Sequence, residues 1–251
     1  MFKNKLINLV KKEVLGVKID DVNIDQALSL VETWLTPPLK YFGPKKEVKG
    51  YYIVTPNPEF VVAAQTDGVF KKILNDADLS IPDGIGLKLF AGFKNRVAGI
   101  DFMERIIKLS VEKGFTVGFL GGDIGVAERC AERLRQIYQN ISIVFVDQGG
   151  KIDQNGWTDK KLTVPKMDIL FVGYGMINQE KWINKNLKRY PVKVAMGVGR
   201  SFDYLSGNLP RAPKFIRTLG FEWLFSLIMQ PWRIKRQLRL ITFLKLLYLH
   251  P

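Results

Sequence analysis

The sequence has few of the residues that would give it disulfide, histidine or membrane-spanning chemistry. Cys130 is its single cysteine, so no disulfide can form within the chain and a reducing compartment is expected. The single histidine, His250, lies next to the C-terminus, which argues against a histidine dyad or histidine metal site inside the fold. No stretch reaches the ~18 uninterrupted apolar residues of a spanning helix, and the first residues lack the apolar core of a signal peptide. We therefore expect a cytoplasmic protein.

Acidic residues are also scarce relative to basic ones. The chain has 38 Lys and Arg against 24 Asp and Glu, a net charge of +14. From Arg200 to Pro251, nine basic residues stand against two acids; the resulting +7 is half of the surplus in about a fifth of the chain. A surplus gathered in one segment favours an anionic partner, which can be nucleic acid, anionic lipid or a phosphorylated substrate.

The glycine-rich loops lack the pattern of a dinucleotide-binding protein. Gly121-Gly122-Asp123-Ile124-Gly125 follows an apolar run, but Leu120 stands where the first glycine of Gly-X-Gly-X-X-Gly is needed. Gly173-Tyr174-Gly175 and Gly197-Val198-Gly199 both lack the third glycine. No cofactor is therefore predicted, although backbone N–H groups in such loops can hold a diphosphate-containing substrate. Tight strand-to-helix turns account for each loop equally well.

The middle of the chain alternates short apolar runs with helical patterns. The runs at 51–54, 79–81, 115–120, 141–146, 167–172 and 192–196 predict strands, with helices between most of them. Because the runs are apolar throughout, both faces of each strand should be covered. The sequence thus predicts an α/β fold, a Rossmann-like and mostly parallel sheet with helices on both faces. A further strand is predicted at 14–19, and 151–166 is polar with an uncertain helix.

The end of the chain differs in composition from the rest. We expect an α/β catalytic domain over residues 1–207 and a basic, aromatic, helical C-terminal appendage over residues 208–251. Pro231 should break the helical pattern, and Trp232 to Leu249 should form a second helix with arginines spaced by three. Tryptophan, leucine and arginine together suit a helix that lies in a membrane interface better than one that crosses it.

Polar residues and glycines gather where the predicted strands end, which is where α/β sheets bind ligands. Asp83, in Pro82-Asp83-Gly84, follows one such strand. A carboxylate fixed there can remove a proton from a hydroxyl nucleophile, but it can equally be the aspartate of a turn, and local sequence leaves both open. Asp76-Ala77-Asp78 formally matches a divalent-metal motif, yet it closes a helix before a strand, so no metal site is predicted.

These residues resemble the signature blocks of the WecG/TagA/CpsF glycosyltransferases, glycosyltransferase family 26. The blocks that carry the resemblance are Thr55–Glu59, Ala77–Gly86, Arg96–Asp101, Phe119–Gly122, Asp168–Gly175, Gln179–Ile183, Gly197–Gly199, Phe202-Asp203, Gly207, Arg211–Pro213 and Glu222–Leu224. They extend over about residues 14 to 240, and their number and order make the resemblance specific.

The resemblance implies an inverting transfer of a sugar, typically N-acetylmannosamine or its uronate, from a UDP donor. The acceptor would be a polyprenyl-diphosphate-linked N-acetylglucosamine, and the enzyme would lie peripherally on an anionic membrane surface, at the inner face of the cell membrane. Family products include teichoic acid linkage units and surface polysaccharides such as capsule. The sequence leaves open whether the protein forms a homo-oligomer.

Carried onto this chain, the resemblance makes Asp83 the catalytic base. It makes Thr55, Asn57, Arg96, Gln179, Arg211, Arg233 and Arg236 substrate-binding residues, and the glycine-rich loops add Gly121, Gly122 and Gly175 as candidates. Two positions depart from the family pattern: Ile177 stands where proline is usual, and Arg200 where a small residue is usual. An added cation at Arg200 would favour a different donor sugar, such as an acidic one.

Two other functions are compatible with parts of the sequence. The net charge permits a nucleic-acid-binding protein, but the basic tail is rich in Leu, Phe and Trp and no recognised nucleic-acid motif occurs, so no nucleic-acid partner is predicted. A Rossmann-type oxidoreductase is disfavoured by the missing glycines.

Overall fold

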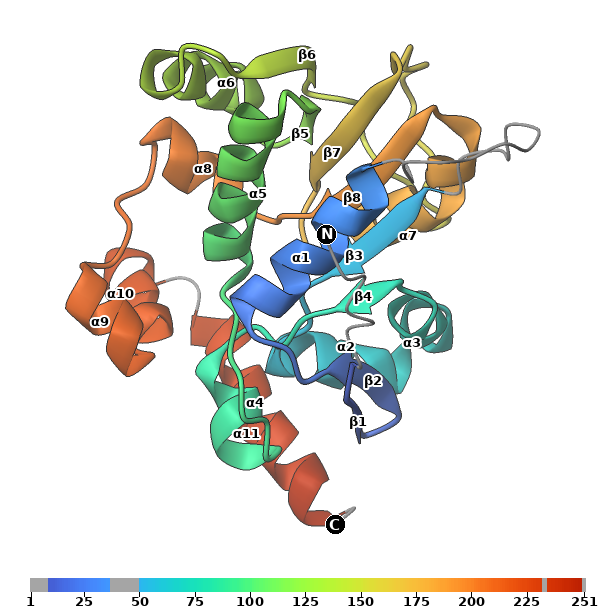
Figure 1. Ribbon diagram of the computed structural model, residues 1–251. Coiled ribbons are helices and arrows are strands. Elements are labelled where there is room, and N and C mark those ends of the chain that lie inside the picture. The colour runs from blue at the N-terminus through green and yellow to red at the C-terminus, as the bar shows by residue number, and fades with distance from the viewer. Residues whose placement is uncertain (1–8, 37–49, 232–233, 250–251) are drawn as a thin grey trace, which may run out of the picture.

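A six-stranded parallel sheet forms the centre of the protein. The computed structural model describes residues 9–36, 50–231 and 234–249 (Figure 1). Its strand order is β4-β3-β8-β7-β5-β6, and every pairing in this sheet is parallel, which confirms the predicted α/β fold. The strands are β3 (Tyr51–Val54), β4 (Leu79–Ser80), β5 (Thr116–Gly121), β6 (Ser142–Asp147), β7 (Met167–Gly173) and β8 (Val192–Gly197).

The predicted strand at 14–19 is instead a hairpin outside the main sheet. Its antiparallel strands are β1 (Lys11–Val14) and β2 (Val17–Asp20). Leu15 and Gly16 between them both have positive φ, 51° and 80°, which reverses the chain where a continuous strand was expected. Leucine at the first of these positions gave no signal of a turn.

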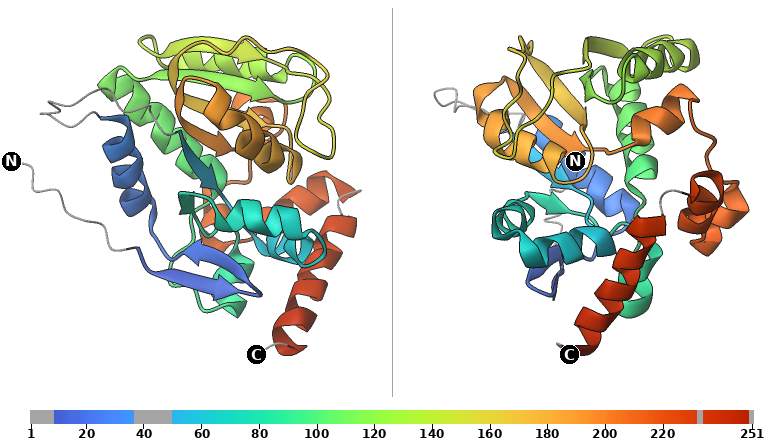
Figure 2. Two further views of the ribbon diagram at one scale, coloured as in Figure 1. Left: turned by 90° about the vertical axis from the view of Figure 1, so that its right-hand side faces the viewer. Right: turned by 180° about the vertical axis from the view of Figure 1, so that it is seen from behind.

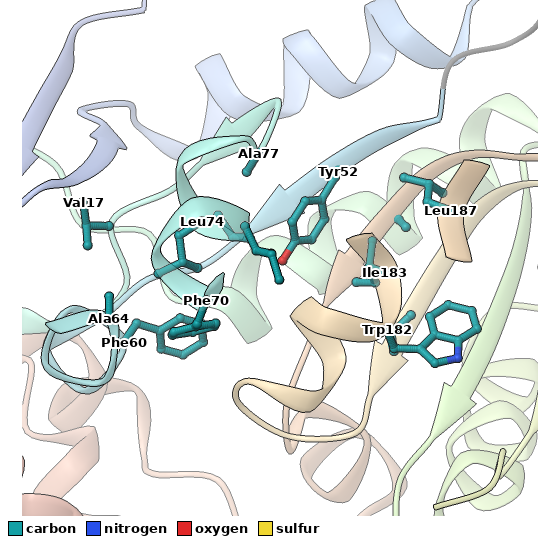
Figure 3. Close-up of a cluster of buried hydrophobic side chains, with 14 of the residues drawn as sticks. Val17, Tyr52, Phe60, Ala64, Phe70, Leu74, Ala77, Trp182, Ile183 and Leu187 are labelled. Carbon is teal, nitrogen blue, oxygen red and sulfur yellow. The ribbon is translucent and has the colours of Figure 1, made fainter. Parts of the chain in front are cut away.

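Helices cover both faces of the sheet, as predicted. They are α1 (Ile24–Leu35), α2 (Pro58–Thr66), α3 (Gly68–Asn75), α4 (Ile85–Phe90), α5 (Gly99–Lys113), α6 (Val126–Ile137), α7 (Asn178–Asn186), the 3-10 helix η1 (Leu187–Arg189), α8 (Ser201–Ser206), α9 (Lys214–Leu219), α10 (Glu222–Met229) and α11 (Ile234–Leu249). Buried residues of α2, α3, α7 and α11 form one core, and those of α1, α5, α6 and α8 form the other. Figure 3 shows part of the first core, where Tyr52 of β3 lies among side chains of α3 and α7.

Side chains at the helix starts explain where the chain leaves the sheet. The Asn57 side-chain oxygen accepts hydrogen bonds from the backbone N–H groups of Glu59 and Phe60, at 2.9 and 3.2 Å, and Pro58 occupies the first turn of α2. Residues 151–166 contain no helix, contrary to the uncertain prediction, because Asp153 accepts hydrogen bonds from Asn155 and Trp157 N–H groups and so fixes a turn.

The C-terminal segment, defined here as residues 208–251, extends beyond the sheet and returns to it. No residue of α9 or α10 is buried, and both helices project from the body of the molecule (Figure 2). After Pro231 the chain continues in α11, which runs alongside α4 and packs on α2, with Phe243 fully buried. The segment therefore covers one end of the sheet with helices that have little core of their own.

Candidate functional site

A cavity of about 570 Å³ lies at the carboxyl ends of the central strands. Its walls come from the residues that follow β3, β4, β7 and β8, and the C-terminal segment closes one side. Of the predicted site residues, the cavity brings together Thr55, Asn57, Asp83, Arg96, Gly175 and Gln179. These positions are far apart in the sequence and meet because the parallel strands deliver them to one edge.

Asp83 is held in the cavity wall by backbone groups. Its own N–H donates to the carbonyl oxygen of Pro56 at 2.9 Å, which ties the turn after β4 to the loop after β3. Its carboxylate accepts backbone N–H groups from Gly99 and Gly84. Gly84 has φ +81°, a conformation that favours glycine and allows the chain to turn directly from Asp83 into α4.

The surroundings of Asp83 raise its pKa to about 6. Burial is the largest cause, and the negative charge of Glu222 adds to it, while the Gly99 and Gly84 N–H groups and the Arg96 charge oppose it. A carboxylate with a pKa close to neutrality is a better proton acceptor than an ordinary aspartate and is still ionised above pH 6. The position of Asp83 in the cavity and its raised pKa would suit a general base.

The pH dependence of catalysis should follow the Asp83 carboxyl. We expect kcat/KM to fall as the pH is lowered through about 6, because the protonated carboxyl can no longer accept a proton. The measurement is the initial rate of product formation at low substrate concentration across this range, with substrate-free samples checked for folding by circular dichroism. A rate that stays constant as the pH falls below 6, in a folded protein, would contradict the role of Asp83.

Arg96 connects the Asp83 turn to the C-terminal segment. One guanidinium N–H group donates to the carbonyl oxygen of Arg217 at 2.9 Å. Gly220, between α9 and α10, lies so close that a Cβ atom there would be 2.9 Å from Ile85 Cγ1 and 3.1 Å from Arg96 Nη1. The turn at Gly220 therefore rests directly on the residues beside Asp83.

Gln179 and Glu180 fix the part of the cavity wall that follows β7 and β8. The Gln179 side-chain oxygen accepts the Gly199 N–H at 2.8 Å, and its amide nitrogen donates to Glu180 at 2.6 Å. Glu180 also accepts the N–H of Ile177 at 2.6 Å, and burial raises its pKa to about 7. Ile177 has φ +76°, a rare conformation for a β-branched residue, so this buried carboxylate stabilises a strained loop between Gly175 and α7.

The structure places the remaining predicted residues elsewhere. Gly121 and Gly122 are not in the cavity wall; a Cβ on Gly121 would be 3.0 Å from the backbone of Gly173, so this glycine allows two strand ends to pack closely. Arg211 is not in the cavity wall either; it pairs with the carboxylates of Asp101, Glu104 and Glu222. Arg233 and the side chain of Arg236 lie outside the described residues. Substrate binding by these five residues stays a prediction.

Two cavity residues had no predicted role: Tyr204 gave no signal in the sequence, and Glu222 belongs to a block of the resemblance but had no function assigned to it. Arg200 was noted only as a departure from the family pattern; it lines the cavity, and its guanidinium donates to Gln230 at 3.0 Å and to Asp203 at 3.2 Å.

Among the described residues, no group of three or more His, Cys, Asp or Glu side chains is arranged to hold a metal ion. Within those residues, Asp78 accepts the N–H of Tyr52 at 2.9 Å, which gives it a structural role.

A substitution at Gly99 can disturb the surroundings of Asp83 without changing Asp83 itself. A Cβ atom at Gly99 would lie 3.3 Å from Thr55 Oγ1 and 3.4 Å from Asp83 Oδ2, so Thr55 must shift by a few tenths of an ångström while the new methyl group comes into van der Waals contact with the Asp83 carboxylate. We expect Gly99→Ala to lower kcat roughly tenfold through this misplacement while the unfolding temperature changes little. Gly68→Ala is the matched control, because no atom lies within 4 Å of its Cβ position. Equal kcat values in the two variants would show that catalysis does not depend on the exact position of the Asp83 carboxylate.

Comparison with known proteins identifies relatives over nearly the whole chain. The profile of the glycosyl transferase WecG/TagA/CpsF family matches residues 12–250. An N-acetylglucosaminyldiphosphoundecaprenol N-acetyl-beta-D-mannosaminyltransferase of Staphylococcus aureus is 32% identical over 235 residues, 91% of this chain and 89% of that protein. A protein of the same name from Bacillus spizizenii is 34% identical over 195 residues, 76% of each chain. The similarity thus includes both the sheet and the C-terminal segment.

Proposed function

Since the chain belongs to the WecG/TagA/CpsF family of glycosyl transferases, we propose that it transfers N-acetylmannosamine or its uronate from a UDP donor. The chain is a glycosyltransferase homologous to N-acetylmannosaminyltransferases of cell-wall polymer synthesis. The proposed acceptor is a polyprenyl-diphosphate-linked N-acetylglucosamine, in keeping with the names of both relatives. The observation that carries the proposal is the Asp83 carboxylate, whose pKa is raised to about 6, in a cavity that also holds two arginines, Arg96 and Arg200.

The proposed reaction is a single displacement with inversion. Asp83 accepts the proton of the acceptor hydroxyl as the hydroxyl oxygen forms its bond to the anomeric carbon of the donor sugar. The bond between that carbon and the UDP oxygen breaks at the same time, and UDP leaves with the bonding electron pair. Attack from the face opposite UDP inverts the anomeric configuration. Arg96 and Arg200 are the cavity cations, within the described residues, that can stabilise the charge developing on the diphosphate.

Exposed apolar side chains on the helices that contribute to the cavity wall support a membrane-bound acceptor. They comprise Leu89 and Phe90 of α4, Phe215, Leu219, Phe221, Ile228 and Met229 of the α9–α10 region, and Ile234, Leu238 and Ile241 of α11. Within the described residues, no helix is both long enough and apolar enough to cross a bilayer. We propose peripheral binding to the inner face of the cell membrane, with the basic C-terminal segment on anionic lipid.

The test is transfer to a lipid-linked acceptor. The full chain is incubated with polyprenyl-diphosphate-linked N-acetylglucosamine and each of several UDP-sugars, and products are identified by mass. We expect transfer from UDP-N-acetylmannosamine or its uronate, and UDP binding without NAD binding. No transfer from any UDP-sugar would overturn the proposal, and salt-sensitive DNA binding without preference for lipid would favour the nucleic-acid alternative.

A further inference from the structure

A second carboxylate, from the C-terminal segment, lines the same cavity as Asp83. Glu222 is the first residue of α10, directly after the turn at Gly220 that rests on Ile85 and Arg96. Its negative charge acts on the Asp83 carboxyl. The charged residues that line the cavity in the described part of the chain are Asp83, Glu222, Glu59, Arg96 and Arg200. Glu222, although far from Asp83 in the sequence, therefore belongs to the surroundings of Asp83.

Helix α5 positions both carboxylates. Its first residue, Gly99, donates its N–H to Asp83. One turn later, Asp101 and Glu104 form ion pairs with Arg211, and the Nε group of Arg211 donates to Glu222 at 3.4 Å. Because one helix anchors Asp83 directly and Glu222 through Arg211, the two carboxylates keep a defined relation only while the C-terminal segment is docked.

Within the ion-pair cluster, the contact between Arg211 and Glu222 is long. Arg211 is shared among the three carboxylates of Asp101, Glu104 and Glu222. Arg217 adds one cation, but it contacts Asp101 at 3.2 Å. Arg211 contacts Asp101 at 2.5 Å and Glu222 only at 3.4 Å, so this cation lies closer to Asp101 than to Glu222. Glu222 can therefore still repel a negative charge on Asp83.

We propose that Glu222 is a positioning residue of the transfer reaction, whose carboxylate makes Asp83 a stronger base when the C-terminal segment lies on the Asp83 turn. This inference rests on the proposed function. A fixed negative charge disfavours the ionised form of Asp83, so the carboxyl holds a proton taken from the acceptor hydroxyl more firmly. The positive charge of Arg96 opposes this effect, which keeps Asp83 ionised before the reaction begins.

The kinetic test compares Glu222→Gln with Glu104→Gln. Both variants remove one carboxylate partner of Arg211, but only Glu222 lines the cavity. We expect Glu222→Gln to move the acid limb of the pH profile of kcat/KM to lower pH, by on the order of half a pH unit. The variant should also have a kcat several-fold lower at neutral pH, because Asp83 becomes a weaker base. Glu104→Gln should keep the wild-type limb. An unchanged limb in Glu222→Gln, or equal shifts in both variants, would overturn the inference.

A titration without substrate separates this inference from the proposed function. The protein is labelled with ¹³C at the aspartate side-chain carboxyls, and the Asp83 signal is assigned by its absence in Asp83→Asn. The pKa of Asp83 should be lower in Glu222→Gln than in the wild type and unchanged in Glu104→Gln. If the wild type transfers no sugar, the proposed function fails, yet this shift still shows the coupling. An unchanged Asp83 pKa in Glu222→Gln overturns the coupling, whatever the activity.

Discussion

Asp83→Asn is expected to lower kcat by about three orders of magnitude, the range that removal of a general base produces. The amide cannot accept a proton from the acceptor hydroxyl, but its oxygen can still accept the N–H groups of Gly99 and Gly84 that hold the carboxylate. UDP binding should therefore change little. Single-turnover rates with saturating donor and acceptor would measure the loss, and calorimetric titration with UDP would show that the site is intact.

The stability of the Asp83→Asn variant provides an independent check. The pKa of Asp83 is raised in the folded protein from its ordinary value near 3.8 to about 6, so between these pH values the folded state binds more protons than the unfolded state. Folding stability contributed by this group is thus lost as the pH rises from about 4 to about 6. Above that range Asp83→Asn should be more stable than the wild type, by up to about 3 kcal/mol. Full turnover in the variant, or a destabilised fold at neutral pH, would contradict this account.

Much of the fold could be predicted because it is encoded locally. Apolar runs covered on both faces predict parallel strands, and Asn57-Pro58 marks the start of α2. Asp83 stood out because a strand end followed by glycine is visible in the sequence. The hairpin at Leu15-Gly16 and the short helices α8 and α9 gave weaker signals, since short elements gain stability from tertiary packing rather than from propensity.

The part of the site that sequence reasoning missed depends on long-range contacts. Substrate binding by Arg211 stays a prediction, but its contacts with Asp101, Glu104 and Glu222 were not predicted. Asp101 and Arg211 are 110 residues apart, so no local pattern indicates that they meet. Glu222 had no assigned role because its location depends on the fold. It lines the cavity only because the Gly220 turn lies against Ile85.

Removal of residues 208–251 should have the second large effect. The truncated chain loses the cavity wall formed by Leu219, Phe221, Glu222, Trp223 and Leu240, so transfer to a lipid-linked acceptor should fall at least about a hundredfold. It should also be less stable, because α11 buries Phe243 against α2. Radiolabelled sugar transfer and thermal unfolding would measure the two effects. Full activity on the lipid acceptor would show that the segment is not part of the site.

A single substitution can separate the effect of the C-terminal segment on catalysis from its effect on folding stability. Gly220→Ala places a Cβ atom 2.9 Å from Ile85 Cγ1, which should lift the segment from the Asp83 turn. Gly114→Ala is the matched control: it has a similar positive φ at a helix end, 72° against 84°, but no atom lies within 4 Å of its Cβ position. Both should lose about 1 kcal/mol of stability from the strained backbone. Only Gly220→Ala should lose transfer, roughly tenfold, because only there does the cavity open; equal transfer rates in the two variants would mean that contact at Gly220 does not complete the site.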